Sequence, residues 1–238
     1  MNNIRLFYPN SIVENSTSLL SKEHTHYVAN VMRLKRGSKI NFFNETGEWL
    51  SEIIFLEKDR VEVRFLKKIE RELNESTNTE LAICLVKKTP MEFILQKATE
   101  LGVSKIIPII SERTEIKDLN YERAQKILIE ATEQSNQLKP PEISKVIKLK
   151  DFMENIKGNI KLFFADINSK NKLKNDDSKN NDLKIILIGP EGDFSPSERE
   201  LILSNPSTTP FSISKNILRS DTAVISAISL VNFINKNH

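Results

Sequence analysis

The chain contains a glycine-rich loop with two acids between an expected strand and an expected helix. Ile185–Ile188 is aliphatic and mostly β-branched, as buried strands are, and Ser195–Glu198 (SPSE) has the pattern of a capping box at a helix start. Between them lies Gly189–Asp193 (GPEGD), and open α/β sheets bind ligands in such loops. The acids disfavour a phosphate, and no common nucleotide-binding glycine motif is present. We therefore expect a ligand with hydroxyls, a cation and a flat ring.

Other charged side chains extend this candidate site. Arg113 follows the expected strand Lys105–Ile110, at the carboxyl end where ligand sites form. Arg219 and Asp221 begin the final expected helix, where an acid can accept a proton and an arginine can stabilise charge developing on an oxygen. The structural alternative is a first-turn acid that complements the helix dipole beside a surface arginine. Glu133 lies in the last turn of an expected helix, where the helix dipole disfavours acids. This unfavourable position suggests that Glu133 has a functional role.

The composition limits the protein class. Hydrophobic residues make up 39% and charged residues 28% of the 238 positions, as in soluble globular proteins, and the net charge of +3 permits an RNA partner without requiring one. The single Cys84 excludes an internal disulfide and is expected to be a buried, inert thiol. The three histidines show no metal-ligand spacing, so we expect no metal. No stretch resembles a signal peptide or membrane span, which predicts a cytoplasmic protein without membrane attachment.

Two regions differ in their hydrophobic pattern. Residues 1–72 form a small β-rich module, with strands expected at Lys39–Phe43, Trp49–Phe55 and Arg60–Leu66 and a polar linker at Arg71–Thr79. In residues 73–238 strands alternate with helices, which predicts a mostly parallel sheet covered on both faces. Its strands are expected at Leu81–Val86, Lys105–Ile110, Ile160–Ala165, Ile185–Ile188 and near Pro210–Ile213, and its helices at Thr89–Gly102, Tyr121–Gln134, Pro196–Leu203 and from Asp221.

Two of the expected helices have informative features. The first, Thr89–Gly102, has a capping-box pattern at its start, Thr89–Glu92 (TPME), and a glycine at its end. The last is apolar on nearly all sides between Ala223 and Ile234. A helix that is apolar all round must be covered all round, either by a second subunit or by burial within one chain. These two possibilities are equally favoured by the sequence.

Several segments resemble one family of RNA-modifying enzymes. Ile188–Ser195 (IGPEGDFS) is similar to the IGPEGG(F/L)S motif of the RsmE-type methyltransferases, a SPOUT family that forms N3-methyluridine in 16S rRNA of the small ribosomal subunit. Lys87–Val103, Ala131–Ile143 and Ile217–Ala223 resemble further family segments in the same order. The N-terminal Arg5–Phe7 and His26–Arg33 also fit, so the resemblance extends over nearly the whole chain.

The resemblance implies a fold, a cofactor and partners. The fold would be a SPOUT-type trefoil-knotted parallel-sheet domain over residues 73–238, preceded by a small PUA-like β-barrel RNA-binding domain over residues 1–72. The implied cofactor is S-adenosyl-L-methionine (SAM), the partner 16S rRNA in the small ribosomal subunit, and the assembly a homodimer. Implied cofactor-binding residues are Gly189, Glu191, Gly192, Ile213, Ser214, Ile217 and Leu218, implied catalytic residues Arg219, Asp221 and Arg113, and implied RNA-binding residues Arg5, Arg33, Lys35 and Arg36.

The chain departs from the family pattern at two loops. Asp193 stands where glycine is usual, although aspartate tolerates a left-handed backbone better than most residues. Ser214–Asn216 (SKN) replaces a glycine-proline-arginine sequence, and Ser214 adds a Cβ where a close approach was possible. We expect a valine at Gly192 to crowd the loop and abolish SAM binding. The departures leave two rivals to the methyltransferase reading: a catalytically weakened RNA-binding ribosome-assembly factor, and a SPOUT methyltransferase with a different RNA target.

Overall fold

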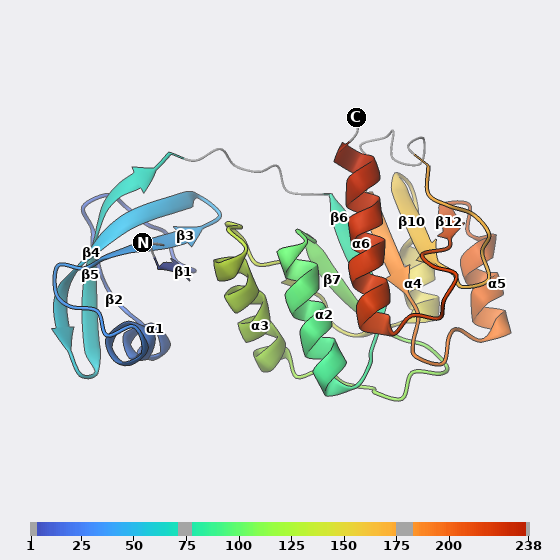
Figure 1. Ribbon diagram of the computed structural model, residues 1–238, viewed down its shortest axis with the longest axis horizontal. Helices are drawn as coiled ribbons and strands as arrows, with labels where there is room; N and C mark the ends of the chain where they lie inside the picture. The colour runs from blue at the N-terminus through green and yellow to red at the C-terminus, as the bar shows by residue number, and fades with distance from the viewer. Residues whose placement is uncertain (1–3, 71–77, 175–182, 237–238) are drawn as a thin grey trace. The chain divides into compact units, whose positions relative to one another are not determined.

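The chain divides into two compact units. The computed structural model describes residues 4–70, 78–174 and 183–236 (Figure 1). One unit comprises Met1–Asn74 together with Thr132–Lys139, and the other comprises Glu75–Ala131 together with Pro140–His238. The predicted domain boundary at residue 72 and most of the expected linker, residues 71–77, lie outside the described residues.

The N-terminal unit contains a five-stranded sheet, which confirms the small β-rich module. The strand order is β1-β3-β4-β5-β2, with β1 parallel to β3 and the other neighbours antiparallel. Phe42, Ile53 and Val63 are fully buried in its core. The strands are β1 (Arg5–Phe7), β2 (Thr17–Leu19), β3 (Lys39–Asn44), β4 (Gly47–Glu57) and β5 (Arg60–Ile69), and α1 (Lys22–His26) continues into the π-helix η1 (Tyr27–Val31). The three long strands were predicted, whereas the three-residue strands β1 and β2 are too short to show a periodic pattern.

The second unit is built on a parallel sheet, as predicted. The strand order is β12-β10-β11-β6-β7-β8, with β9 also paired to β7, and every pair of neighbours runs parallel. The strands are β6 (Thr79–Cys84), β7 (Lys105–Ile110), β8 (Glu142–Ile143), β9 (Ile147–Lys148), β10 (Ile160–Ala165), β11 (Leu183–Ile188) and β12 (Thr208–Phe211). This order brings the carboxyl ends of β10 and β11 together. The trefoil knot implied by the resemblance stays a prediction.

Helices cover both faces of this sheet (Figure 1). α2 (Lys88–Glu100), α3 (Tyr121–Gln134) and α6 (Ser220–Lys236) pack on one face, and α4 (Leu149–Asn155) and α5 (Pro196–Ser204) pack on the other. Within β6, Leu81 and Ile83 face the α2 side, whereas Ala82 and Cys84 face the α4 side. Successive side chains of a strand point to opposite faces, which explains why a strand buried on both sides is apolar throughout.

The start of α2 differs from its predicted form. The N-cap is Lys87 in an extended conformation, and no side chain caps the helix. Thr89 lies one residue inside α2, and the Glu92 carboxylate binds Arg123 of α3 instead of the helix start. The predicted capping box at Thr89 is therefore wrong. The predicted helix end is confirmed, because Gly102 follows α2 with a φ of 85° and its N–H binds the carbonyl of Thr99.

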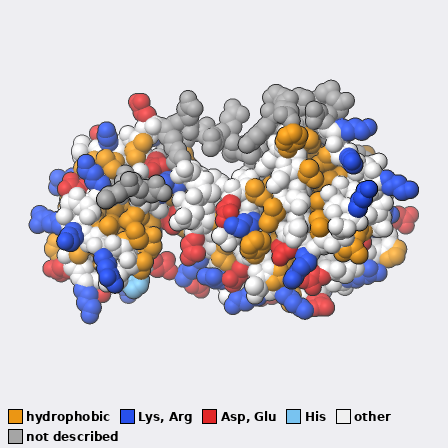
Figure 2. Space-filling model, in the orientation of Figure 1, with side chains coloured by type: hydrophobic (Ala, Val, Ile, Leu, Met, Phe, Trp, Pro, Cys, Tyr) orange, Lys and Arg blue, Asp and Glu red, His pale blue; other side chains and the backbone are white. Residues whose placement is uncertain are grey.

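The final helix α6 is covered by its own chain on one side. Val224, Ala227, Ile228 and Val231 are fully buried in the core that includes α2. Further along α6, 39% of Leu230 and 64% of Phe233 are exposed, and Figure 2 shows hydrophobic side chains over this helix. Burial within the chain therefore accounts for one face of α6 and leaves a second, smaller apolar face on the surface.

Candidate functional site

The glycine-rich loop leads from β11 into α5 through the predicted capping box. The Ser195 hydroxyl accepts a hydrogen bond from the N–H of Glu198 at 3.3 Å, and the Ser195 N–H donates to the Glu198 carboxylate at 3.0 Å. The same carboxylate accepts from the N–H of Glu112, 2.8 Å away in the loop after β7. The start of α5 is thus tied to a second strand end, which holds the loop at the edge of the sheet.

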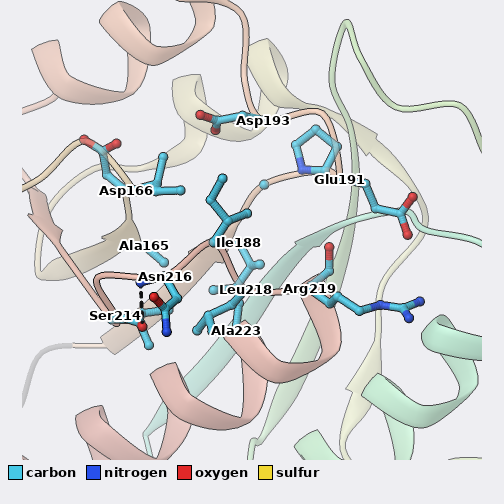
Figure 3. A pocket seen from close by; sticks show the side chains of 16 residues that line it. Ala165, Asp166, Ile188, Glu191, Asp193, Ser214, Asn216, Leu218, Arg219 and Ala223 are labelled. Carbon is cyan, nitrogen blue, oxygen red and sulfur yellow. Dashed lines mark hydrogen bonds between the residues drawn. The ribbon is translucent and has the colours of Figure 1, made fainter.

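A cavity of about 460 Å³ opens beside this loop (Figure 3). It is lined by Ala165–Ile167 at the end of β10, by most of Ile188–Asp193 at the end of β11, and by part of Ile213–Ala223, which leads into α6 and includes its first turn. Its volume lies within the usual range for small-molecule sites. The predicted position of a ligand site, at the carboxyl ends of parallel strands, agrees with this geometry.

Most of the predicted cofactor residues meet at this cavity. The six that line it are Gly189, Glu191, Ile213, Ser214, Ile217 and Leu218, whereas Gly192 does not line it. Ile188, Leu218 and Ala223 give the wall an apolar part, and Glu191 and Asp193 supply carboxylates. This combination fits a ligand with a flat ring, hydroxyls and a cation.

The two loop glycines have different surroundings. A Cβ added to Gly189 would lie 3.0 Å from Cε2 of the buried Phe194 ring, which is closer than side chains normally pack. A Cβ added to Gly192 would meet only Arg113, at 3.8 Å, which is an ordinary contact, and Gly192 is not among the glycines with positive φ. A Cβ alone therefore causes no crowding at Gly192, whereas Gly189 is the glycine that the packing requires. The expected effect of a valine at Gly192 on SAM binding stays a prediction.

Asp193 adopts the left-handed backbone conformation that the sequence left open. Its φ is 59°, and its N–H donates to the carbonyl of Pro190 at 3.0 Å to close the turn. The Asp193 Oδ1 accepts a hydrogen bond from the N–H of Phe194 at 2.8 Å. Short polar side chains make such local bonds, which is why aspartate tolerates this conformation.

The segment that departs from the family pattern forms a compact turn. The Ser214 hydroxyl accepts a hydrogen bond from the N–H of Asn216 at 3.0 Å, drawn dashed in Figure 3. The Ser212 hydroxyl donates to the Ser214 carbonyl at 3.2 Å. Ile217 follows with 85% of its surface exposed. The Ser214 side chain thus stabilises the turn with a local hydrogen bond, and the cavity beside the turn remains open.

The three predicted catalytic residues occupy different positions. Arg219 lines the cavity and is exposed. Asp221, in the first turn of α6, does not line the cavity, and its Oδ1 accepts from the N–H of Thr222 at 2.7 Å. Arg113 also lies outside the lining, and its Nη1 donates to the Gly192 carbonyl at 2.8 Å. The structure thus brings Arg219 to the cavity and leaves Asp221 and Arg113 beside its loops.

Asp166 is a site residue that the sequence reading missed. It lines the cavity directly after β10, is 3% exposed, and accepts from Arg199 Nη2 at 2.7 Å. That hydrogen bond is the main cause that raises the pKa of Arg199. A buried carboxylate needs such a partner because its desolvation is costly. The available signal was its position after the predicted strand Ile160–Ala165, the same signal that identified Arg113.

Arg5 has a structural role in the N-terminal unit. Its side chain is 10% exposed, and its Nε donates to Glu48 at 3.0 Å while its guanidinium stacks on Phe43. Its two Nη atoms donate to the carbonyls of Glu133 and Gln137, which belong to the same unit. A guanidinium with these partners is not presented to a phosphate, so the RNA contact expected of Arg5 is not supported.

The other three predicted RNA contacts are exposed. Arg33, Lys35 and Arg36 are exposed in the loop before β3, and Arg33 has a left-handed φ of 50°. Their charges face solvent, as both a phosphate-binding cluster and a plain solvated face require.

The acid Glu133, at the end of α3, has a hydrogen-bond partner. Its Oε1 accepts from the N–H of Phe7 at 2.9 Å. Its unusual place in the last turn of α3 therefore has a structural reason.

Two further findings concern metals and membranes. Within residues 4–70, 78–174 and 183–236, no group of three or more His, Cys, Asp and Glu side chains is arranged to hold a metal ion. None of the helices in the described part of the chain has both the length and the hydropathy that a membrane crossing requires.

Comparisons with known proteins agree over nearly the whole chain. Residues 71–232 match the family described as RNA methyltransferase domain, and residues 20–66 match the RNA methyltransferase PUA domain. The ribosomal RNA small subunit methyltransferase E of Rickettsia conorii is 37% identical over 235 residues, 97% of this chain and 95% of that protein. The chain belongs to the ribosomal RNA small subunit methyltransferase E family.

Solved structures of related proteins have the same fold as this chain. The ribosomal RNA small subunit methyltransferase E of Neisseria gonorrhoeae, solved with bound S-adenosyl methionine, has a TM-score of 0.87 and 27% identity, with 98% of each chain covered. A methyltransferase from Legionella pneumophila, solved with SAM as its bound cofactor, has a TM-score of 0.88 and 29% identity over 98% of each chain. Both units of the chain are thus similar to those of family members.

Proposed function

We propose that this protein is a SAM-dependent methyltransferase that forms N3-methyluridine in 16S rRNA of the small ribosomal subunit, acting in the cytoplasm. The observation that carries the proposal is the cavity formed by three loops at the carboxyl ends of β10 and β11 and the start of α6. It belongs to a chain whose family members act on small-subunit ribosomal RNA and whose solved relatives bind SAM.

The residues of the cavity suit the chemistry of this cofactor. SAM has a flat adenine, a ribose with two hydroxyls, an amino-acid end and a sulfonium cation. The apolar part of the wall, with Ile188, Leu218 and Ala223, suits the ring, and the Glu191 and Asp193 carboxylates suit hydroxyl, ammonium and sulfonium groups. When bound, SAM supplies a methyl group already activated for transfer, so the protein chiefly has to position the groups and manage a proton.

The proton comes from N3 of the uracil, a weakly acidic imide. It must leave before or as the methyl group arrives, and negative charge then develops on the neighbouring carbonyl oxygens. We assign Arg219 to stabilise that charge and Asp221 to accept the proton or orient the base. Arg113 acts through the Gly192 carbonyl that it binds and is a positioning residue. The target uridine has to be unstacked to reach the cavity.

The rival reading is an RNA-binding ribosome-assembly factor with weakened catalysis, and the Ser214–Asn216 departure favours it. Calorimetry with SAM and with the demethylated product distinguishes the two readings, because a pure RNA-binding factor has no need of the cofactor. Mass spectrometry of 16S rRNA from a deletion strain then tests the reaction. Loss of N3-methyluridine, restored by the gene, is expected. Loss of another modified base in its place would indicate a different RNA target.

We also propose that the protein is a homodimer through the exposed face of α6. Leu230 and Phe233 on this face are large, apolar and exposed, and covering them would remove apolar surface from water. Leu230→Glu should therefore yield monomers in sedimentation. Leu201→Glu on α5 is the matched control, because each leucine is 39% exposed. A variant at Ile228 would not test the proposal, since this side chain is fully buried within its own chain. A monomeric unmodified protein at micromolar concentration would contradict the proposal.

A further inference from the structure

The charges around the cavity are unequally compensated. Among the residues that the structure describes, four charged side chains line it, the acids Asp166, Glu191 and Asp193 and the cation Arg219. Asp166 is paired with Arg199, 2.7 Å away. The remaining groups are two acids and one cation, so the wall carries an excess negative charge.

Within the described part of the chain, Asp193 is the unpaired acid on the side of the cavity away from Arg219. In Figure 3, Glu191 lies on the same side of the cavity as Arg219, whereas Asp193 lies on the side of Asp166. Arg199, whose charge also interacts with Asp193, already forms a hydrogen-bonded ion pair with the buried Asp166. The pKa of Arg199 is raised first by its hydrogen bond to Asp166 and only last by the charge of Asp193. The hydrogen bond of Asp193 to the Phe194 N–H, at 2.8 Å, is made within the loop and brings no cation.

We propose that Asp193 makes the cavity prefer the cationic cofactor SAM over its neutral reaction product, S-adenosylhomocysteine (SAH). This inference rests on the proposed function. In the reaction the S–CH₃ bond breaks and its electron pair stays on sulfur, an N3–CH₃ bond forms, and the N3 proton passes to a base and then to solvent. The cofactor thereby loses one positive charge, since a sulfonium becomes a thioether. A fixed carboxylate attracts the first form and not the second, so the preference favours exchange of product for new cofactor.

The size of the effect follows from the Coulomb interaction between one carboxylate and one sulfonium. At separations of several ångströms and the effective dielectric of a partly exposed site, removing the carboxylate should weaken SAM binding by about threefold to tenfold. Binding of SAH, which has no sulfonium charge, should change by less than about twofold.

Asp193→Asn isolates the charge, because asparagine also tolerates the left-handed backbone and its Oδ1 can still accept from the Phe194 N–H. Asp118→Asn is the matched control. Asp118 is exposed, lies outside the cavity lining, and likewise accepts from the following N–H, that of Leu119, at 2.8 Å. Calorimetry with SAM and SAH on the full chain gives the ratio of the two dissociation constants for each protein.

The expected result is a ratio that shifts toward SAH by about threefold to tenfold in Asp193→Asn and stays unchanged in Asp118→Asn. Equal weakening of both ligands, or no change in either, would overturn the inference. If Asp193→Asn fails to fold, the salt dependence of binding to the unmodified protein tests the inference. SAM affinity should then fall more steeply with salt than SAH affinity, and equal salt dependence would overturn the inference. If the unmodified protein binds neither ligand, the proposed function itself has failed.

Discussion

The Nη1 of Arg113 donates a hydrogen bond to the carbonyl oxygen of Gly192 at 2.8 Å and so joins the loop after β7 to the loop after β11. The neighbouring Glu112 N–H makes a second connection to Glu198, at 2.8 Å. Two adjacent residues of one loop therefore hold the glycine loop and the start of α5. This relationship places Arg113 outside the cavity lining, where it holds a loop that forms the wall.

A positioning role for Arg113 predicts an effect on cofactor binding. Arg113→Ala should weaken SAM binding by about fivefold, since an exposed hydrogen bond contributes about 1 kcal/mol. The methylation rate at saturating SAM should change little. Calorimetry and single-turnover methylation measure the two quantities. The control is Arg123→Ala, which removes an exposed arginine that pairs with Glu92 away from the cavity. A rate loss of about 10²-fold or more with normal SAM affinity would instead indicate a catalytic role.

Alanine substitution should destabilise the protein at Gly189 and have almost no effect at Gly192. Gly189→Ala should lower the free energy of unfolding by about 1–3 kcal/mol, because its Cβ would press on the Phe194 ring, which packs against Phe164. Gly192→Ala should change it by less than about 0.5 kcal/mol, since the added Cβ would make only an ordinary contact with Arg113, at 3.8 Å. Urea denaturation measures both variants, and each serves as the control for the other. Similar losses for both would show that the packing around Gly189 is not the cause.

Arg219 and Asp221 should act on the methyl-transfer step. We expect Arg219→Ala and Asp221→Asn to lower single-turnover methylation by about 10²–10⁴ and to leave SAM affinity nearly unchanged. Lys215→Ala is the control, because Lys215 is exposed in the same segment and does not line the cavity. If only Arg219→Ala reduces the rate, the Asp221 carboxylate serves its hydrogen bond to Thr222 and the helix start. Losses that merely follow SAM affinity would remove both residues from the catalytic step.

The exposed cluster Arg33, Lys35 and Arg36 should contribute to RNA affinity through phosphate contacts. Replacing all three, with asparagine at Arg33 to suit its left-handed backbone, should weaken RNA binding and reduce the slope of log affinity against log salt by about two to three. SAM affinity should stay the same. Filter binding of a 16S rRNA fragment at several salt concentrations measures the slope.

The control for this triple variant removes three other cations from the same unit. Lys58, Arg60 and Arg64 are exposed on and beside β5, and their replacement by glutamine changes the net charge by the same amount. A general charge effect would reduce the salt slope equally in both triple variants. Such a result would make the Arg33 cluster an ordinary solvated face.

His24 should make stability depend on pH. Burial lowers the pKa of His24 below its ordinary 6.5 and outweighs the opposing effect of the Glu23 charge. The unfolded chain then binds the proton more readily than the folded protein, so stability rises with pH up to about 6.5 and is lost as the pH falls through this window. His24→Gln should flatten this dependence in urea denaturation between about pH 5 and pH 7.5. His26→Gln, at an exposed histidine, is the control. An unchanged dependence of stability on pH in His24→Gln would refute the assignment.

The sequence by itself determined the elements whose information is local. β7, β10 and α3 begin and end at the predicted residues, because each is a run of periodic or apolar residues between polar ones. The start of α5 was likewise predictable, since the capping box joins residues only three apart. The position of a ligand loop at the carboxyl end of β11 followed from the same local pattern.

Only the tertiary structure decided which partners the charged side chains have. Arg5 was expected to bind RNA but pairs with Glu48, 43 positions away, and Arg113 meets Gly192 across 79 positions. Asp166 lines the cavity and pairs with Arg199 of α5, 33 positions away. Such contacts depend on the order in which strands assemble into a sheet, and no local pattern in the chain specifies that order.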